Sequence, residues 1–289
     1  MDRRADHLAQ AIDGLLAMDV PTITVVVQSN DAAGAADSLR RRLRPSPGAP
    51  PAVRVAPRLT ALFTTPMPRR SVVALQWRPG VLRRHGFYLT WGHIAVMRAA
   101  LASGQYSHFV YLEDDIGFTQ ENLDYWCRYR SHLASAGLLP GFVRFEEKAD
   151  ERFVIDLKQP VPRAHPRRHV ECGEEGTRTF LVMPNPYQAM YVVDRPLAAE
   201  HFRFSPARSP FTSLGARGGG WGVRERAAMG PIFDDVPRGL HARNAVLERA
   251  EPTGPQLHPG CMIGHLAGGY VDEPQFGLPV VRMAETFVP

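Results

Sequence analysis

A strand-like run that ends in three consecutive carboxylates constrains this sequence more than any other feature. Residues His108–Leu112 have the character of a buried strand, and Glu113, Asp114 and Asp115 follow them directly. Three adjacent anions repel one another and cost folding free energy unless a cation lies among them. At the end of a parallel strand in an α/β sheet, that cation is usually a metal ion that bridges a phosphorylated ligand.

A solvated acidic turn is the alternative interpretation of the same run. Apolar residues resume directly after the carboxylates, at Ile116 and Phe118. A turn that only faces water does not need apolar residues on both sides. The pattern therefore favours a metal site over a solvated turn.

Length and composition are those of an ordinary globular protein. With 289 residues, of which 44% are hydrophobic, the chain can form one large α/β domain or two small ones. No stretch approaches the roughly 18 apolar residues that a membrane span requires. The amino terminus leads into an amphipathic helical pattern rather than a secretory apolar core. We therefore expect a soluble, cytoplasmic protein without a membrane span.

Cysteines and charge exclude further classes. Cys127, Cys172 and Cys261 are odd in number and lack metal-binding spacing, which argues against a disulfide framework and a structural zinc site. The net charge is +5, but only Lys148 and Lys158 are lysines among 34 basic residues. This ratio is typical of a GC-rich coding genome. Because no nucleic-acid-reading motif accompanies it, we expect no nucleic-acid partner.

Helices and strands alternate along the first half of the chain. Apolar periodicity predicts helices over residues 6–18, 91–102 (capped by Thr90) and 121–136, a short helix from 196, and another over 221–229. Apolar runs predict strands at 22–27, 71–75, 108–112, 188–193 and 260–264, and a hairpin at 142–145 and 152–155. Residues 40–58, 159–178 and 205–220 are predicted to be loops. Strands that alternate with helices, followed by a mixed half, indicate an α/β fold.

The acidic run resembles a known metal motif. Tyr-Leu-Glu113-Asp114-Asp115 after an apolar strand looks like the motif of nucleotide-sugar-dependent glycosyltransferases of the GT-A fold, in the Glu-Asp-Asp version found in inverting N-acetylglucosaminyltransferases. Shorter matches occur at residues 7–16, at 220–226, which resembles an acceptor loop, and at 263–266, which resembles a segment with a late metal-binding histidine. The resemblance covers roughly residues 7 to 270.

The resemblance implies a GT-A-like (Rossmann-like) α/β fold, with one mixed central sheet flanked by helices in a single domain. Residues 1–158 would form its nucleotide-sugar and metal-binding half, and residues 159–289 its acceptor-binding half. In that fold a strand precedes the first helix, whereas here the sequence starts at the helix. We therefore expect that other residues fill the nucleotide pocket, or that a second protomer of a homo-oligomer completes it.

Metal chemistry accounts for the acidic residues. A nucleotide diphosphate leaves readily only if its growing negative charge is neutralised, which a divalent ion can do as a Lewis acid. By resemblance, Asp115 binds the ion directly, while Asp114 and Glu113 contact the ribose or the donor sugar. His265 would complete a site suited to Mn²⁺ or Mg²⁺. A histidine packed in the core or in a loop is the alternative for His265, which is one of 11 histidines.

An inverting transfer also needs a general base for the acceptor hydroxyl. Glu225 is the candidate, because it follows a glycine-rich loop and Trp221, and because Arg224 and Arg226 would keep it ionised. The alternative is an exposed helical glutamate paired with these arginines. A retaining enzyme would not need such a base, and Glu225 would then only bind the acceptor.

Other polar and aromatic residues are candidates for substrate contacts. Gln28 and Asn30 follow a predicted strand and can bind the nucleotide, as can Arg78 and Trp91. Tyr187 and, by the resemblance of its loop, Trp221 are candidates for the acceptor site. Ordinary loop polarity or core packing explains each of these residues equally well.

The sequence therefore predicts a metal-dependent glycosyltransferase that moves a sugar from a nucleotide diphosphate, UDP-linked in our expectation, to an unidentified acceptor with inversion. A nucleotidyltransferase of similar fold is the enzymatic alternative, although it usually carries a glycine-rich basic phosphate loop, which is not found here. A catalytically silent protein that binds sugars or nucleotides is the other alternative.

Overall fold

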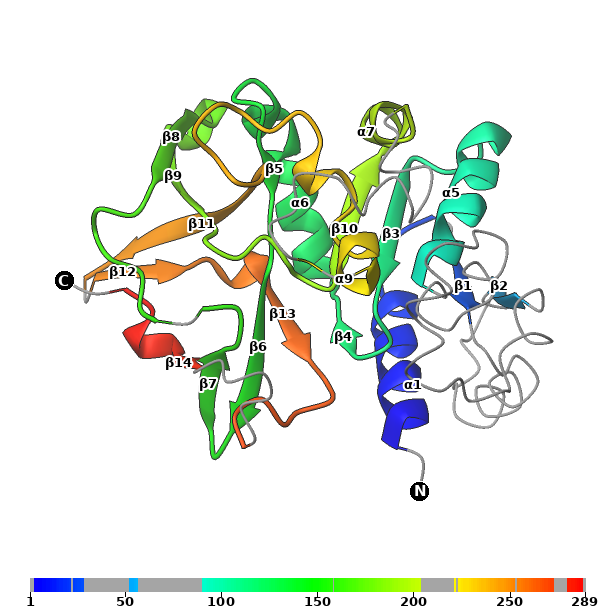
Figure 1. The fold of residues 1–289 in the computed structure, drawn as a ribbon, viewed down its shortest axis with the longest axis horizontal. Helices are drawn as coiled ribbons and strands as arrows, with labels where there is room; N and C mark the ends of the chain where they lie inside the picture. The colour runs from blue at the N-terminus through cyan, green and yellow to red at the C-terminus, as the bar shows by residue number, and fades with distance from the viewer. Residues whose placement is uncertain are drawn as a thin grey trace, which may run out of the picture. The chain divides into compact units, whose positions relative to one another are not determined.

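The computed structural model describes residues 3–21, 23–28, 52–56, 90–157, 159–203, 221, 223–252, 254–272 and 280–287. In this part the chain is mixed α/β, with several small sheets and few helices (Figure 1). It divides into two compact units. The first holds Met1–Leu16, Val20–Tyr111 and Tyr191–Gly230, and the second holds Ala17–Asp19, Leu112–Met190 and Pro231–Pro289. No helix among the described residues is long and apolar enough to cross a membrane.

The first unit begins with a helix packed on a strand. Helix α1 (Arg3–Leu16) and strand β1 (Thr24–Gln28) share a small apolar cluster, whose members are Ile12, Val27, Leu8, Leu16 and Val25. Both elements were predicted from the apolar pattern, and both are confirmed. Strand β1 pairs in parallel with β2 (Ala52–Ala56). The loop prediction for residues 40–58 is therefore wrong at β2, because pairing with β1 gives a strand to a segment rich in Arg, Pro and Ala.

A second two-stranded sheet is formed by β3 (His108–Leu112) and β10 (Met190–Asp194). Helix α5 (Gly92–Ser103) precedes β3, and α7 (Arg195–His201) follows β10. The Asp194 carboxylate caps α7 by accepting from the backbone N–H of Leu197 at 2.7 Å. These helices and strands confirm the predictions for 91–102, 108–112, 188–193 and the helix from 196.

The predicted cap of α5 is wrong. Trp91, not Thr90, occupies the N-cap position, and no side chain caps this helix end. The Thr90 carbonyl oxygen instead accepts a hydrogen bond from Nδ1 of His93. Helix α9 (Val223–Ala227) completes the described part of the first unit and confirms a helix within 221–229. The strand predicted at 71–75 and the loop predicted at 205–220 lie outside the described residues.

The second unit contains a five-stranded sheet in the order β14-β7-β6-β13-β4 (Figure 1). Its strands are β14 (Val281–Arg282), β7 (Glu151–Val154), β6 (Val143–Lys148), β13 (Met262–His265) and β4 (Ile116–Gly117). The predicted hairpin is confirmed, because β6 and β7 are antiparallel and joined at Ala149 and Asp150, whose φ angles are positive at 49° and 65°. Strand β13 runs parallel to β6 and antiparallel to β4, so it joins distant parts of the sequence.

A second sheet of this unit has the order β12-β11-β9-β8, and β5 pairs with β11. Its strands are β12 (Gly254–Leu257), β11 (Asn244–Glu251), β9 (Thr177–Val182), β8 (Arg167–Glu171) and β5 (Leu139–Pro140). The loop prediction for 159–178 is wrong at β8. This strand has one buried residue and is rich in Arg and His, so its antiparallel ladder with β9 gives it a strand conformation. Strand β11 was not predicted.

Helix α6 (Gln120–Ala134) confirms the helix predicted after the acidic run and is anchored to β13. The carboxamide of Asn122 accepts from the backbone N–H of Thr119 at 2.9 Å, which caps the helix. The same side chain donates to the carbonyls of Gly260 and Met262 at 2.9 and 2.8 Å. This buried amide therefore fixes the start of α6 relative to β13. Four 3₁₀ turns complete the described elements: η3 (Gly173–Glu175), η4 (Gly230–Phe233), η5 (Pro259–Cys261) and η7 (Met283–Glu285).

The first unit buries a neutral histidine. His93 is 8% exposed, and its Nε2 accepts from the Tyr191 hydroxyl at 2.6 Å. Burial is the main cause that lowers its pKa from 6.5 to about 3. Between these two values the unfolded chain binds a proton that the folded chain does not bind. Folding stability should therefore fall as the pH drops through this window.

We expect His93→Gln to remove this dependence. As the pH drops below 6.5, the free energy of unfolding should fall more steeply in the wild type than in the variant. The difference between the two slopes should be up to about 1.4 kcal/mol per pH unit. Urea unfolding curves between pH 7 and pH 4 measure the difference. His108→Gln, which changes an exposed histidine on β3, is the control and should follow the wild type. Parallel curves for wild type and His93→Gln would contradict the assignment.

Candidate functional site

The acidic run forms a tight turn between β3 and β4. The backbone N–H of Ile116 donates to the carbonyl oxygen of Glu113 at 3.3 Å, which closes the turn. The backbone N–H of Glu113 donates to the carbonyl oxygen of Ala189, just before β10, at 3.1 Å. Ile116 and Phe118 are 0% and 1% exposed. The apolar residues after the run therefore anchor the turn in the core and hold three carboxylates at its edge.

Strand β13 brings a distant histidine to this turn. His265 lies opposite Ile116 in the antiparallel ladder between β13 and β4. The backbone N–H of Leu266 donates to the carbonyl of Asp115 at 2.7 Å. As a result Nε2 of His265 lies 3.4 Å from Oδ2 of Asp115. Two residues that sequence analysis assigned to one site are thus neighbours in the structure, although 150 positions separate them in the numbering.

Glu146, which sequence analysis missed, holds this histidine from the other side. Its carboxylate accepts from Nδ1 of His265 at 2.6 Å. It also accepts three backbone N–H bonds from the loop after β13, from Gly269, Tyr270 and Val271, at 3.1, 3.3 and 3.1 Å. Glu146 is only 4% exposed. The only signal in the sequence is a Glu in the charged turn between the two predicted hairpin strands, which does not distinguish it from Glu147.

The hydrogen bond to Glu146 determines how His265 faces Asp115. Because Nδ1 carries the proton that Glu146 accepts, Nε2 is the nitrogen that faces the Asp115 carboxylate. Burial acts to lower the pKa of His265, but the hydrogen bonds to Asp115 and Glu146 outweigh it and raise this pKa to about 9. For both carboxylates burial acts to raise the pKa, but hydrogen bonding with His265 outweighs it and lowers the pKa of each. In the metal-free protein His265 is therefore a cation between two anions.

Glu113 faces a different set of partners. Its Oε1 accepts from the hydroxyl of Tyr187 at 2.8 Å. The guanidinium carbon of Arg144 lies 4.8 Å from the centroid of the Tyr187 ring, which places a cation over the aromatic face. Burial raises the pKa of Glu113 to about 7, although the Tyr187 hydrogen bond opposes this. Tyr187, predicted as an acceptor contact, is thus a neighbour of the acidic run.

Arg144 is fixed by a buried ion pair. Its Nη2 and Nε donate to Oδ1 of Asp156 at 2.7 and 3.0 Å, and its backbone N–H donates to Oδ2 at 2.8 Å. The side chains are 8% and 1% exposed. Burial acts to lower the pKa of Arg144, but Asp156 outweighs it and raises this pKa. Neither residue was predicted from the sequence to belong to the site.

The remaining predicted residues lie elsewhere or are not described. Asp114 is half-buried in the turn beside Asp115. Gln28, at the end of β1, and Trp91, before α5, belong to the first unit, as do Trp221 and Glu225. Glu225 is half-buried in α9, and its neighbour Arg226 donates from Nε to the Trp221 carbonyl at 3.0 Å. Asn30, Arg78 and the Arg224 side chain lie outside the described residues.

The donor set at Asp115 and His265 fits a divalent cation completed by a ligand. Carboxylate and imidazole donors at about 2.1 Å from one ion lie roughly 3.0–3.4 Å apart for bond angles between 90° and 109°, and the observed separation is 3.4 Å. Among the described residues no group of three or more His, Cys, Asp or Glu side chains is placed to hold a metal by itself. Mg²⁺ characteristically takes one or two protein ligands and fills the rest with water and phosphate oxygens.

Comparison of the chain with protein-family models, with curated proteins and with solved structures finds no match. The geometry of the site is therefore the basis for a proposed function.

We expect Glu146→Gln to destabilise the protein by about 1–3 kcal/mol, because an amide cannot accept all four hydrogen bonds and buried N–H groups lose their partner. Urea unfolding measures this loss. Hydrogen exchange at Gly269 and Val271 should accelerate in the same variant. Glu147→Gln is the matched control, since Glu147 is 59% exposed and its change should cost less than about 0.5 kcal/mol. Equal effects of the two substitutions would refute the anchoring role of Glu146.

Proposed function

We propose that this protein is a metal-dependent glycosyltransferase of the GT-A type. It transfers a sugar from a nucleotide diphosphate donor, UDP-linked in our proposal, to a hydroxyl group of an acceptor. The observation that carries the proposal is the arrangement of Asp115, His265 and Glu146: a carboxylate beside an imidazole whose other nitrogen is bound by a second carboxylate. Metal-binding histidines almost always have this kind of second partner.

The proposed donor fits the two ligands that the described residues provide. Two protein ligands, Asp115 and His265, leave most of the coordination sphere of Mn²⁺ or Mg²⁺ to the substrate. A diphosphate provides hard oxygen atoms for these positions, which favours a nucleotide diphosphate over a neutral ligand. A divalent ion bound there would neutralise the negative charge that develops on the leaving diphosphate.

The neighbours of the site suggest how the donor sugar is bound. Tyr187 holds Oε1 of Glu113, so the Glu113 carboxyl has a fixed orientation. In this proposal Glu113 and Asp114 accept hydrogen bonds from hydroxyl groups of the ribose or of the donor sugar. Gln28, Asn30, Arg78 and Trp91 keep their proposed role in binding the nucleotide. Fixed hydrogen-bond partners of this kind position a donor without reorganisation during the reaction.

In the transfer the acceptor oxygen forms a bond to the anomeric carbon of the donor sugar. The bond from that carbon to the phosphate oxygen breaks, and its electron pair leaves with the nucleoside diphosphate. For an inverting reaction, Glu225 takes the proton of the acceptor hydroxyl. Trp221, which lies before the same helix, contributes to the acceptor side.

Asp115→Asn tests the proposal most directly. We expect wild-type protein to bind UDP in the presence of Mn²⁺, and the variant to lose this metal-dependent affinity by about a hundredfold or more, because losing a direct ligand should cost at least as much as losing its outer partner. Isothermal titration calorimetry with and without Mn²⁺ measures it. Asp124→Asn, which changes an exposed carboxylate on α6, is the control.

A panel of nucleotide sugars then separates the alternatives. Release of UDP with sugar transfer supports a glycosyltransferase. Release of pyrophosphate from a nucleoside triphosphate and a sugar phosphate would identify a nucleotidyltransferase instead. Metal-dependent nucleotide binding without any turnover would identify a silent binding protein. Absence of metal-dependent nucleotide binding by the wild type would refute both enzymatic functions and a silent nucleotide-binding protein.

A further inference from the structure

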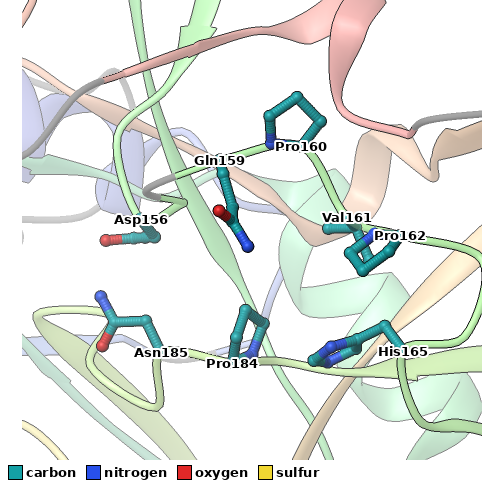
Figure 2. Close-up of a pocket in the computed structure, with 8 residues that line it drawn as sticks. All are labelled: Asp156, Gln159, Pro160, Val161, Pro162, His165, Pro184 and Asn185. Atoms are coloured by element: carbon teal, nitrogen blue, oxygen red, sulfur yellow. The ribbon is translucent and has the colours of Figure 1, made fainter.

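The second unit contains a pocket that the proposed metal site does not use (Figure 2). Its volume is about 380 Å³. One part of its wall is apolar and made of proline rings and a valine, which are Pro160, Val161, Pro162 and Pro184. Polar groups complete the lining, and they are Asp156, Gln159, His165 and Asn185. Ligand sites in proteins commonly combine an apolar wall with a few placed polar groups in this way.

The apolar wall is rigid before any ligand binds. Proline rings have fixed φ angles, so they lose little conformational entropy when a ligand packs on them. The backbone N–H of Val161 donates to the carbonyl of Thr286 at 2.7 Å. Arg167 donates from Nη1 to the carbonyls of Arg163 and His165 at 2.7 and 3.2 Å, and its Nε binds Glu248 at 2.7 Å. The loop that forms one side of the pocket is therefore tied to strand β11.

The polar groups are oriented by the protein. Oδ1 of Asn185 accepts from the backbone N–H of Tyr187 at 3.1 Å, so the Asn185 amide nitrogen is the free donor of that carboxamide. Nε2 of His165 donates to the carbonyl of Val182 at 2.7 Å, which leaves Nδ1 as an acceptor. In Figure 2 the carboxamide of Gln159 extends into the opening between the two sides. The pocket thus offers both donors and acceptors.

The described lining residues carry no net charge available to a ligand. The described residues that line the pocket include no lysine or arginine. Its single carboxylate, Asp156, is neutralised by the buried guanidinium of Arg144. Among the described lining residues, a phosphate or carboxylate ligand would find no lysine or arginine, and a cationic ligand would find no unpaired anion.

From these observations we propose that the pocket binds a neutral saccharide of one or two pyranose rings. The faces of a pyranose are C–H surfaces that can pack on proline rings, and its edges are hydroxyl groups that match Asn185, Gln159 and His165. The assignment of this pocket as the acceptor subsite rests on the proposed function. Three contacts connect the pocket to the acidic run: Asp156 binds Arg144, Arg144 lies over Tyr187, and Tyr187 binds Glu113.

Binding of methyl glycosides to the metal-free and nucleotide-free protein tests the proposal. The probes are the methyl glycosides of glucose, galactose, mannose and N-acetylglucosamine, and methyl β-D-glucuronide is the anionic match of the glucose probe. Saturation-transfer NMR and calorimetry measure binding. At least one neutral glycoside should bind with millimolar or better affinity, and the glucuronide should bind at least roughly tenfold more weakly than its neutral match because its carboxylate has no cation to pair with.

Two substitutions test whether the glycoside binds in the pocket. Gln159→Leu changes an exposed side chain, and Asn185→Asp keeps the acceptor for Tyr187 but removes the amide donor. Each should weaken glycoside binding roughly fivefold to tenfold, the value of one hydrogen bond. Gln256→Leu, on the exposed face of β12, is the matched control and should leave binding unchanged. Circular dichroism confirms that each variant is folded.

The outcomes distinguish the pocket from the metal site. Glycoside binding that Gln159→Leu and Asn185→Asp weaken supports the pocket proposal, even if Mn²⁺-dependent UDP binding is absent and the transferase proposal fails. UDP binding without binding of any glycoside overturns the pocket proposal and leaves the transferase proposal standing. Equal binding of glucuronide and glucoside, or loss of binding in Gln256→Leu alone, also overturns it.

Discussion

The position of His265 between two carboxylates is the interaction on which the candidate site depends. An imidazolium that is nearly buried would lose much of its hydration, and Asp115 and Glu146 replace it with two opposite charges. Conversely, His265 stabilises the half-buried carboxylate of Asp115, and His265 together with the N–H groups of residues 269–271 stabilises the buried carboxylate of Glu146. Removal of one member of such a buried set typically costs about 3–5 kcal/mol. The contacts that determine the geometry of the site therefore also contribute to the local stability of the second unit.

Sheet topology makes this arrangement possible. Strand β13 is inserted between β4 and β6, and it is antiparallel to one and parallel to the other. Its last residue, His265, consequently has Asp115 near one side and Glu146 near the other. Asn122 fixes the beginning of β13 to the start of α6, so the register of the strand is determined at both ends. A shift of one residue would turn the imidazole to the opposite face of the sheet.

The buried pair of Arg144 and Asp156 connects the two candidate binding regions of the second unit. Arg144 lies over the ring of Tyr187, which orients Glu113 in the acidic run. Asp156 lines the pocket proposed to bind a saccharide and would leave a buried unpaired charge if Arg144 were lost. The same ion pair therefore keeps the pocket electrically neutral and the acidic run correctly placed. A single buried pair can thus serve two neighbouring regions.

Local patterns decided much of the secondary structure. The period of the apolar positions was enough for α1, α5 and α6, and alternation around a charged turn was enough for the β6–β7 hairpin. The same rules failed at β2, which lies within an Arg- and Pro-rich stretch, and at the Arg-rich β8, where β1 and β9 provide ladder partners. They also failed at the start of α5, where the Thr90 carbonyl receives the His93 side chain. Propensity is a local quantity, whereas ladder pairing is not.

The sequence by itself determined that a strand would end in Glu113, Asp114 and Asp115 and that apolar residues would bury the following turn, because both features lie within eleven consecutive residues. It also marked His265 and Tyr187 as candidates. Only the tertiary structure decided that His265 faces Asp115, that Glu146 holds it there, and that Arg144 and Asp156 join the acidic run to a neutral pocket. Those contacts join residues up to 150 positions apart, and their energies depend on burial, which no local pattern records.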